Sequence, residues 1–288
     1  MKVTLVQMNS IGDKAANLAT AHALIERAIE LERPDWICLP ECFDFIGGTR
    51  AEKIAAAEDL PGGPAYEMCQ SLAKSNKVHI HAGSILERIP GDDRIHNTSV
   101  AFNREGAEVA RYRKIHMFDI TAPDGAKYHE SAAFKPGGEV VTYECEGLTI
   151  GCAICYDLRF PALYRALAEA GAFFLTVPSA FTRKTGEAHW HVLLRARAIE
   201  TGCFVFAAAQ AGLHENKRET YGHSLIIAPW GEILAEGGTE PGIFMAKIDP
   251  SRVDAARKSV PSLQHGRRFS VADPKAGPEH LHLVRGSA

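Results

Sequence analysis

The sequence predicts a single α/β domain, and three observations support this prediction. The 288 residues are 46% hydrophobic and 23% charged, which is enough apolar material for one large core. Short apolar runs typical of strands recur between segments with helical spacing along the whole chain. No Pro/Ser-rich linker, internal repeat or shift in composition divides them. We therefore expect one domain over residues 1–271 and a tail over residues 272–288 whose ordering would need a partner surface.

The predicted elements follow a clear order. The chain opens with a strand, a helix and a strand, and the helix-strand alternation returns in the second half. Between these parts, two segments each resemble a pair of strands, with turns at residues 104–106 and 146–147. In chain order, the sequence predicts strand 3–8, helix 15–32, strand 35–41, helix 65–76, strand 77–86, strand pairs 98–114 and 140–155, helix 161–171, strand 172–181, helix 187–202, strand 203–212 and hairpin 221–237.

Charge and composition exclude several classes of partner. A net charge of -3 and a pI near 6.5 provide no basic field for nucleic acid. The first residues, "MKVTLVQMNS", resemble a strand rather than a signal peptide, and no apolar run reaches the roughly 18 to 20 residues of a membrane span. The seven cysteines are an odd number scattered through apolar stretches, which favours reduced thiols. We expect a cytoplasmic protein that binds a small molecule.

The stretch "GCAICYDLRFP" at residues 151–161 is the first candidate for chemistry. If residues 148–155 form a strand, Cys155 ends its small-chained face, and Pro161 then starts a helix. A strand, a tight turn and a helix can lift a nucleophile clear of a sheet. Two other interpretations remain: an inert packed cysteine, or a redox or metal pair with Cys152. The pair is the weaker one, because side chains three apart on a strand point to opposite faces.

Two further charged residues follow predicted strands. Glu41 comes directly after an apolar strand and Pro40, at the sheet end where α/β proteins usually keep their sites. Lys114 ends a hairpin strand, on the face that it shares with Ala110 and Tyr112 if alternation holds. Taken alone, either residue could be a solvated surface charge.

Taken together, "LPECF", "YRKIHMFD" and "GCAICYDLRFP" resemble the Glu-Lys-Cys motifs of the nitrilase superfamily of carbon-nitrogen hydrolases, in that family's order. The resemblance runs from "VTLVQM" to "LQHGRR", and Glu130 in "KYHES" matches a second acidic residue of the family. The wording of "HWHVLLRARAIETGCFVFAAAQAG" and "KRETYGHSLII" is closest to the Nit amidases that act on deaminated glutathione. The resemblance implies a four-layer α-β-β-α sandwich that pairs into a dimer, and residues 160–174 are a candidate interface.

The resemblance also implies a mechanism without a cofactor or metal. Cys155 would be the nucleophile, Glu41 the base and then the acid, and Lys114 with the backbone N–H of Tyr156 the oxyanion donors. Glu130 would orient Lys114. A papain-like Cys-His site and a metal pair at His79 and His81 are weaker alternatives, because 13 histidines place some near any cysteine and no chelating partner is spaced for a metal. A non-catalytic scaffold that keeps the fold is the competing class of function.

The substrate is predicted less directly. Arg183, Lys184 and Thr185 are expected on a loop open to ligand, where they could bind substrate carboxylates, and Arg159 is either a substrate contact or a structural brace. Deaminated glutathione fits such charges, as does the 2-oxoglutaramate of omega-amidases. The resemblance to the Nit branch around residues 195–200 makes N-carbamoyl amino acids and nitriles weaker alternatives. His191 stands where the relatives are expected to carry a glutamate near the pocket, and this departure weakens the substrate inference.

Overall fold

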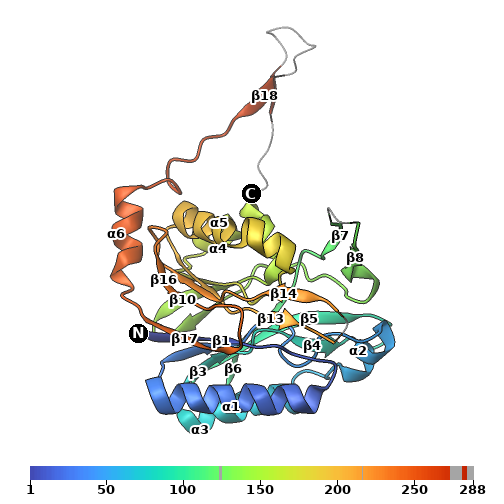
Figure 1. Cartoon of the computed structure of the whole chain (residues 1–288). Coiled ribbons are helices and arrows are strands. Elements are labelled where there is room, and N and C mark those ends of the chain that lie inside the picture. Colours follow the sequence, from blue (N-terminus) through green and yellow to red (C-terminus); the bar gives the residue numbers. More distant parts are fainter. Residues whose placement is uncertain (123–124, 216, 273–280, 284–288) are drawn as a thin grey trace.

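Figure 1 shows the computed structural model of the chain, which describes residues 1–122, 125–215, 217–272 and 281–283, with side chains through residue 269. Two sheets lie between two layers of helices. Helices α1 (Lys14–Glu32) and α3 (Pro64–Asn76) cover one sheet, and α4 (Pro161–Glu169) and α5 (Arg183–Thr201) cover the other. This order of layers confirms the predicted α-β-β-α sandwich.

The first sheet has seven strands in the order β17-β1-β2-β3-β5-β4, with β6 also paired to β5. Its centre is parallel, because β1, β2 and β3 run in one direction, while β17 pairs antiparallel with β1. The strands of this sheet are β1 (Lys2–Gln7), β2 (Trp36–Cys38), β3 (His79–His81), β4 (Ile85–Arg88), β5 (Ile95–Phe102), β6 (Glu108–Arg113) and β17 (Gly242–Lys247).

The second sheet has six strands in the order β16-β15-β12-β11-β10-β9. It repeats the plan of the first, since β10, β11 and β12 are parallel and lie between antiparallel neighbours. The strands of this sheet are β9 (Thr142–Cys145), β10 (Leu148–Cys152), β11 (Phe174–Thr176), β12 (Phe204–Ala207), β15 (Leu225–Ile227) and β16 (Ile233–Glu236).

Shorter elements complete the fold. The hairpin β7–β8 and α2 lie on the same side of the sandwich, away from the N-terminus and α6 (Figure 1). These elements are α2 (Arg50–Ala56), β7 (Asp119–Thr121), β8 (Lys127–His129), the 3-10 turns η1 (Glu130–Ala132) and η2 (Cys155–Arg159), β13 (Ala211–Leu213), β14 (Glu219–Tyr221), α6 (Ser251–Ser259), β18 (Ser270–Ala272) and β19 (Leu281–Leu283).

The main core lies between the two sheets. Trp36 of β2 packs against Phe206 of β12, with 5.3 Å between the ring centroids, so side chains of the two sheets meet directly. Cys152 is buried in this core, where it packs rather than pairs with Cys155. A second cluster, which includes Ile25 and Leu72, fills the space between the first sheet and helices α1 and α3. Both faces of each sheet are therefore covered, as parallel sheets require.

Several predicted boundaries are wrong. The strands expected over residues 77–86 and 203–212 each divide in two, the first into β3 and β4 and the second into β12 and β13. The strand expected over residues 148–155 ends at Cys152, because Cys155 has a φ of +48° and begins the η2 turn. The helix expected over residues 187–202 begins one turn earlier, at Arg183, because Thr182 has extended backbone and Arg183 pairs with Glu187 at i,i+4. The residues 183–185 therefore form the first turn of α5 rather than a loop.

Several elements have weak local signals and were not predicted. Strand β17 has mostly half-buried side chains without clear alternation, and it forms by pairing with β1 from the far end of the chain. Helices α2 and α6 are short. Of the predicted tail, residues 273–280 and 284–288 lie outside the described residues, and the boundary after residue 271 stays a prediction. Strands β18 and β19 pair antiparallel with each other.

Candidate active site

The parallel strands place the predicted site residues at one edge of the sandwich. Glu41 follows β2, and Cys155 follows β10 after two further residues. Lys114 directly follows β6, and burial alternates from buried Tyr112 through exposed Arg113 to Lys114, so that Lys114 points inward. With Glu130 of η1, these residues line one pocket of about 460 Å³, a volume typical of small-molecule sites.

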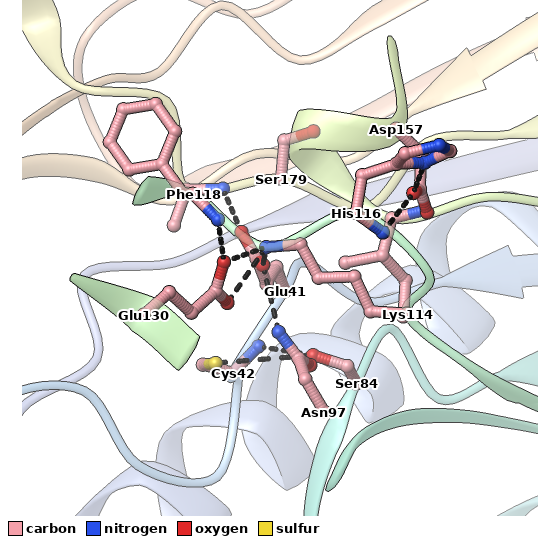
Figure 2. Close-up of polar contacts among 12 residues, drawn as sticks. Glu41, Cys42, Ser84, Asn97, Lys114, His116, Phe118, Glu130, Asp157 and Ser179 are labelled. Carbon is pink, nitrogen blue, oxygen red and sulfur yellow. Dashed lines mark hydrogen bonds and ion pairs between the residues drawn. The ribbon is translucent and has the colours of Figure 1, made fainter. Parts of the chain in front are cut away.

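Lys114 is the centre of the polar network, as Figure 2 shows. Its Nζ donates to Oε1 of Glu41 at 2.9 Å and to both carboxylate oxygens of Glu130, each at 2.9 Å. Only 2% of Lys114 is exposed. A buried ammonium held by two carboxylates is fixed in position, which is what a charge directed at a reacting oxygen needs.

Glu41 is held from several sides. Besides Lys114, its Oε1 accepts from Nδ2 of Asn97 at 2.9 Å, and its Oε2 accepts from the backbone N–H of Ala180 at 2.8 Å. Burial alone would raise the pKa of Glu41, but the charge of Lys114 and the hydrogen bonds of Cys155 and Lys114 bring this pKa below its ordinary value. Glu41 is therefore an ionised carboxylate that can accept a proton.

Cys155 is a protonated thiol, and its proton is the one that the Glu41 carboxylate could accept. Burial and the nearby charge of Glu41 raise the pKa of the Cys155 thiol well above its ordinary value, despite the opposing charge of Lys114. Burial lowers the pKa of Lys114, but the charges of Glu130 and Glu41 outweigh burial and raise this pKa well above its ordinary value. At neutral pH the site therefore holds a neutral thiol beside a carboxylate, with the ammonium charged.

The turn that carries Cys155 is fixed by Asp157, which is fully buried. Its Oδ2 accepts from the backbone N–H of Ile154 at 2.9 Å and from the hydroxyl of Tyr112 at 2.7 Å, while its Oδ1 accepts from the backbone N–H of His116 at 3.0 Å. Tyr112 and His116 flank Lys114 in the chain. Asp157 therefore ties the turn of Cys155 to the segment of Lys114.

Arg159 does not line the pocket. Its guanidinium carbon lies 5.3 Å from the ring centroid of Phe181 and 5.9 Å from that of Tyr156, and its Nη1 is 3.3 Å from Nδ1 of His189. The neighbouring Asp157 is bound by Ile154, Tyr112 and His116, so Arg159 packs on the aromatic rings instead. The structure favours the brace over the substrate contact.

Most of the residues predicted to bind substrate do not line the pocket. Of residues 183–185, only Thr185 lines the pocket. Arg183 lies on the surface, where it pairs with Glu187 and Glu219. Four other cations line the pocket instead, which we call the cationic wall: Lys53, Lys127, Lys217 and Arg218. They come from α2, β8 and the segment before β14, and no local sequence signal joins such distant positions.

The histidines of the alternative metal site contact protein groups instead of each other. His79 Nε2 contacts Oε1 of Glu146 at 2.9 Å, and His81 Nδ1 contacts the hydroxyl of Tyr143 at 3.2 Å. Burial lowers the pKa of His81 to about 3. His191 is absent from the pocket lining, so the expectation that this position lies near the pocket is wrong.

Asn97 is a site residue that the sequence did not reveal. It begins an Asn-Thr-Ser sequence that resembles a glycosylation acceptor, yet it is buried and binds Glu41. The sequence signal for its role is its position on β5, the strand that pairs with β6, because Lys114 directly follows β6.

The chain belongs to the carbon-nitrogen hydrolase family, whose model matches residues 2–258. It is therefore a hydrolase of carbon-nitrogen bonds. It is 41% identical over 263 residues to the deaminated glutathione amidase of Synechocystis, covering 90% of this chain and 96% of that protein. It is 38% identical to the omega-amidase NIT3 of Saccharomyces cerevisiae, covering 94% of each.

A solved structure agrees with this assignment. The NitFhit protein of C. elegans superimposes with a TM-score of 0.86 at 38% identity. The match covers 92% of this chain and 65% of that longer chain. No helix in the described part of this chain is long and apolar enough to cross a membrane.

Proposed function

We propose that this protein is an amidase that hydrolyses a non-peptide amide bond of a small, carboxylate-bearing substrate through a thioester on Cys155. The observation that carries the proposal is the buried arrangement of Cys155, Glu41 and Lys114 beside the cationic wall of one pocket. Among the relatives, two named activities fit: deaminated glutathione amidase, which we place first, and omega-amidase.

The proposed reaction begins with proton transfer from the Cys155 thiol to the Glu41 carboxylate. The thiolate attacks the amide carbon, and the ammonium of Lys114 and the backbone N–H of Tyr156 stabilise the oxyanion. The C–N bond breaks, and the amine leaves with the proton from Glu41. Glu41 then accepts a proton from water, which attacks the thioester, and the thiol is restored as the acid leaves. Glu130 holds Lys114 throughout.

The cationic wall supports a substrate with carboxylates. Lys114 is already bound to Glu41 and Glu130, so its charge is balanced within the site. Lys53, Lys127 and Lys217 add positive charge elsewhere on the same pocket, and Arg218 lines it while donating to the carbonyl of Ala180. Deaminated glutathione has two carboxylates, and several cations can bind both at once.

A hydrolysis panel tests the substrate. We expect the highest kcat/KM with deaminated glutathione, a lower value with 2-oxoglutaramate, and little activity with an N-carbamoyl amino acid or a simple nitrile. Lys217→Gln should raise KM about tenfold with little change in kcat, because it removes ground-state charge pairing. Lys258→Gln, on exposed α6, is the charge-matched control. Activity only on the carbamoyl or nitrile substrate would contradict the proposal.

Mass spectrometry tests the intermediate separately. Rapid acid quenching during turnover should trap an acyl adduct on Cys155, and Cys155→Ala should abolish both the adduct and hydrolysis. Cys42 also lines the pocket, so Cys42→Ala is the matched control and should still form the adduct. Full turnover by Cys155→Ala would refute the thioester, whereas no hydrolysis of any panel substrate by the wild type would favour the non-catalytic scaffold.

We also propose that the chain forms a homodimer, and that it is a cytoplasmic protein with neither nucleic acid nor membrane as a partner. The apolar residues of the predicted interface, residues 160–174, are largely buried in the chain's own core, so they do not support that surface. The exposed apolar residues of α5, the neighbouring β15–β16 turn and the start of β16 support another surface: Val192, Ile199, Trp230 and Ile233. Seven free thiols support the reducing compartment.

A further inference from the structure

Three ligand-type side chains converge on the second sheet, outside the catalytic pocket. His191 Nε2 lies 2.9 Å and His223 Nδ1 lies 3.0 Å from the same carboxylate oxygen, Oε1 of Glu236. One ligand atom from each residue lies within 4.8 Å of the others. None of the three lines the catalytic pocket. We call these residues the His-His-Glu cluster.

We propose that the His-His-Glu cluster binds a divalent transition-metal ion, with Zn²⁺ as the best match. Two imidazoles and one carboxylate are ligands that zinc uses where it keeps one position open for water. Zinc ligand atoms at about 2.0–2.1 Å in a tetrahedron lie about 3.3 Å from one another. The two observed nitrogen–oxygen distances, 2.9 and 3.0 Å, need to open by only a few tenths of an ångström, and the two imidazole nitrogens, which lie within 4.8 Å of each other, must take up the same spacing.

The backbone holds the three ligands in place. His191 lies within α5, and Glu236 is the last residue of β16. His223 has a φ of +53°, its N–H donates to the carbonyl of Gly238 at 2.9 Å, and its own carbonyl accepts from the indole of Trp190 at 2.8 Å. A metal site needs ligands fixed before the ion arrives, and here three elements supply them.

Gly186 permits the close approach that forms the cluster. A Cβ at this position of α5 would lie 2.3 Å from Cβ of Tyr221, so only glycine lets this part of the chain pack against the helix. Tyr221 then stacks on His223, with 4.3 Å between ring centroids and 25° between planes, and its ring meets His191 edge-on. The aromatic ring forms one wall of the cluster and restricts both imidazoles.

The cluster is accessible to an ion. The side chains of His191, His223 and Glu236 are 29%, 24% and 39% exposed, so the histidines are half-buried, Glu236 is exposed and all three are reachable from solvent. The bound ion would join α5 to the β15–β16 hairpin, because its ligands come from both. We infer a site that stabilises this side of the molecule and takes no part in amide hydrolysis.

The test is calorimetric titration of the chelator-treated full chain with Zn²⁺. We expect one tight site per chain. His191→Ala removes a ligand and should lower the Zn²⁺ affinity by at least about tenfold, because losing a residue that only supports a ligand already lowers metal affinity about 10- to 100-fold. Glu236→Gln keeps shape and hydrogen bonding and should weaken it similarly. His189→Ala, on the same helix, and His22→Ala, from a surface His-Glu pair, should bind as the wild type does.

Co²⁺ in place of Zn²⁺ identifies the ligands. We expect visible d–d bands without the thiolate-to-cobalt charge-transfer band that binding at a cysteine would give. Both cluster variants should lose these bands while retaining wild-type amidase activity, which shows that they fold. Unchanged Zn²⁺ affinity in both cluster variants, absence of a saturable site, or a thiolate band would overturn the proposal.

Discussion

At the scale of single residues, the site is defined by where protons reside. Cys155 and Glu41 are both buried, yet burial raises the pKa of the thiol while Lys114 holds the pKa of the carboxylate down. The proton therefore rests on sulfur, and a single transfer would create the proposed nucleophile. Lys114 makes this possible because Glu130 keeps the ammonium charged and fixed.

This arrangement predicts a flat pH profile for kcat/KM. Because the pKa of Glu41 lies below its ordinary value of 4.5, the base persists as pH falls, and activity should decline only below that value. The profile should be level from about pH 5 to 8. A pH-rate series on the wild type checks this, and an acid limb centred near neutrality would contradict it.

Glu41→Gln provides the matched control for that profile. It keeps the shape of the side chain but removes the base, and it should lower kcat by about 10² to 10⁴. Alkylation of Cys155 by iodoacetamide should then rise steeply with pH, because the thiol must lose its proton to water. An unchanged kcat in Glu41→Gln would exclude Glu41 as the base.

At the scale of elements, the site depends on short connections that follow strands. The η2 turn begins with Cys155 in a left-handed conformation, which costs free energy in a non-glycine residue and persists because the surroundings impose it. Asp157 supplies part of that constraint. The loop after β3 similarly supports Glu41, since Oγ of Ser84 accepts from the backbone N–H of Cys42 at 2.8 Å.

Asp157→Asn should release the η2 turn. The amide cannot accept at both oxygens, so one buried donor loses its partner, at a cost of about 1–3 kcal/mol in the free energy of unfolding. We expect kcat to fall about tenfold with a smaller change in KM, because a misplaced nucleophile affects the chemical step. Denaturant unfolding and steady-state kinetics check this. Asp59→Asn, at a largely exposed ion pair, should change neither quantity.

Gly83→Ala should disrupt the loop that supports Glu41. A Cβ on Gly83 would lie 2.0 Å from the carbonyl oxygen of Pro40, and its φ of +36° disfavours alanine as well. We expect a loss of at least about 2 kcal/mol in the free energy of unfolding. Gly91→Ala shares a positive φ, +75°, but meets nothing within 4 Å, so it isolates the steric part. Equal effects of the two variants in denaturant unfolding would show that the clash is relieved.

At the scale of the whole molecule, the sandwich brings together two similar halves. Each sheet has three parallel strands at its centre, and the segments that follow β2 and β10 meet at one edge. Glu41 and Cys155 therefore come from different sheets. The outer face of α5 is left with apolar side chains that no element of the described chain covers, including Val192 at 68% exposure.

The proposed dimer predicts a specific loss of assembly. Trp230→Glu places a charge on the exposed apolar surface beside α5 and should convert a dimeric mass into a monomeric one, because burying an unpaired charge is costly. Leu31→Glu, at an equally exposed leucine of α1 in the opposite layer, should leave the mass unchanged. Sedimentation equilibrium at micromolar concentration checks both. A wild-type monomer would refute the dimer.

The sequence by itself determined the α/β class, most of the central elements and the positions of Glu41, Lys114 and Cys155. These depend on local patterns: apolar runs that end in a charged or nucleophilic residue, and the periods of strands and helices. One boundary failed at Cys155, where the backbone departs from regular geometry, and another at Arg183, where α5 begins one turn before its apolar spacing does. A left-handed residue after a strand leaves no periodic trace.

Only the tertiary structure decided what lies around these residues. The cationic wall joins positions from 53 to 218, and the His-His-Glu cluster joins a helix, a loop and a strand end. Asn97 lies against Glu41 only because β5 pairs with β6, next to Lys114. Such sets form through pairings between distant segments, and neither composition nor local periodicity records which distant side chains will meet.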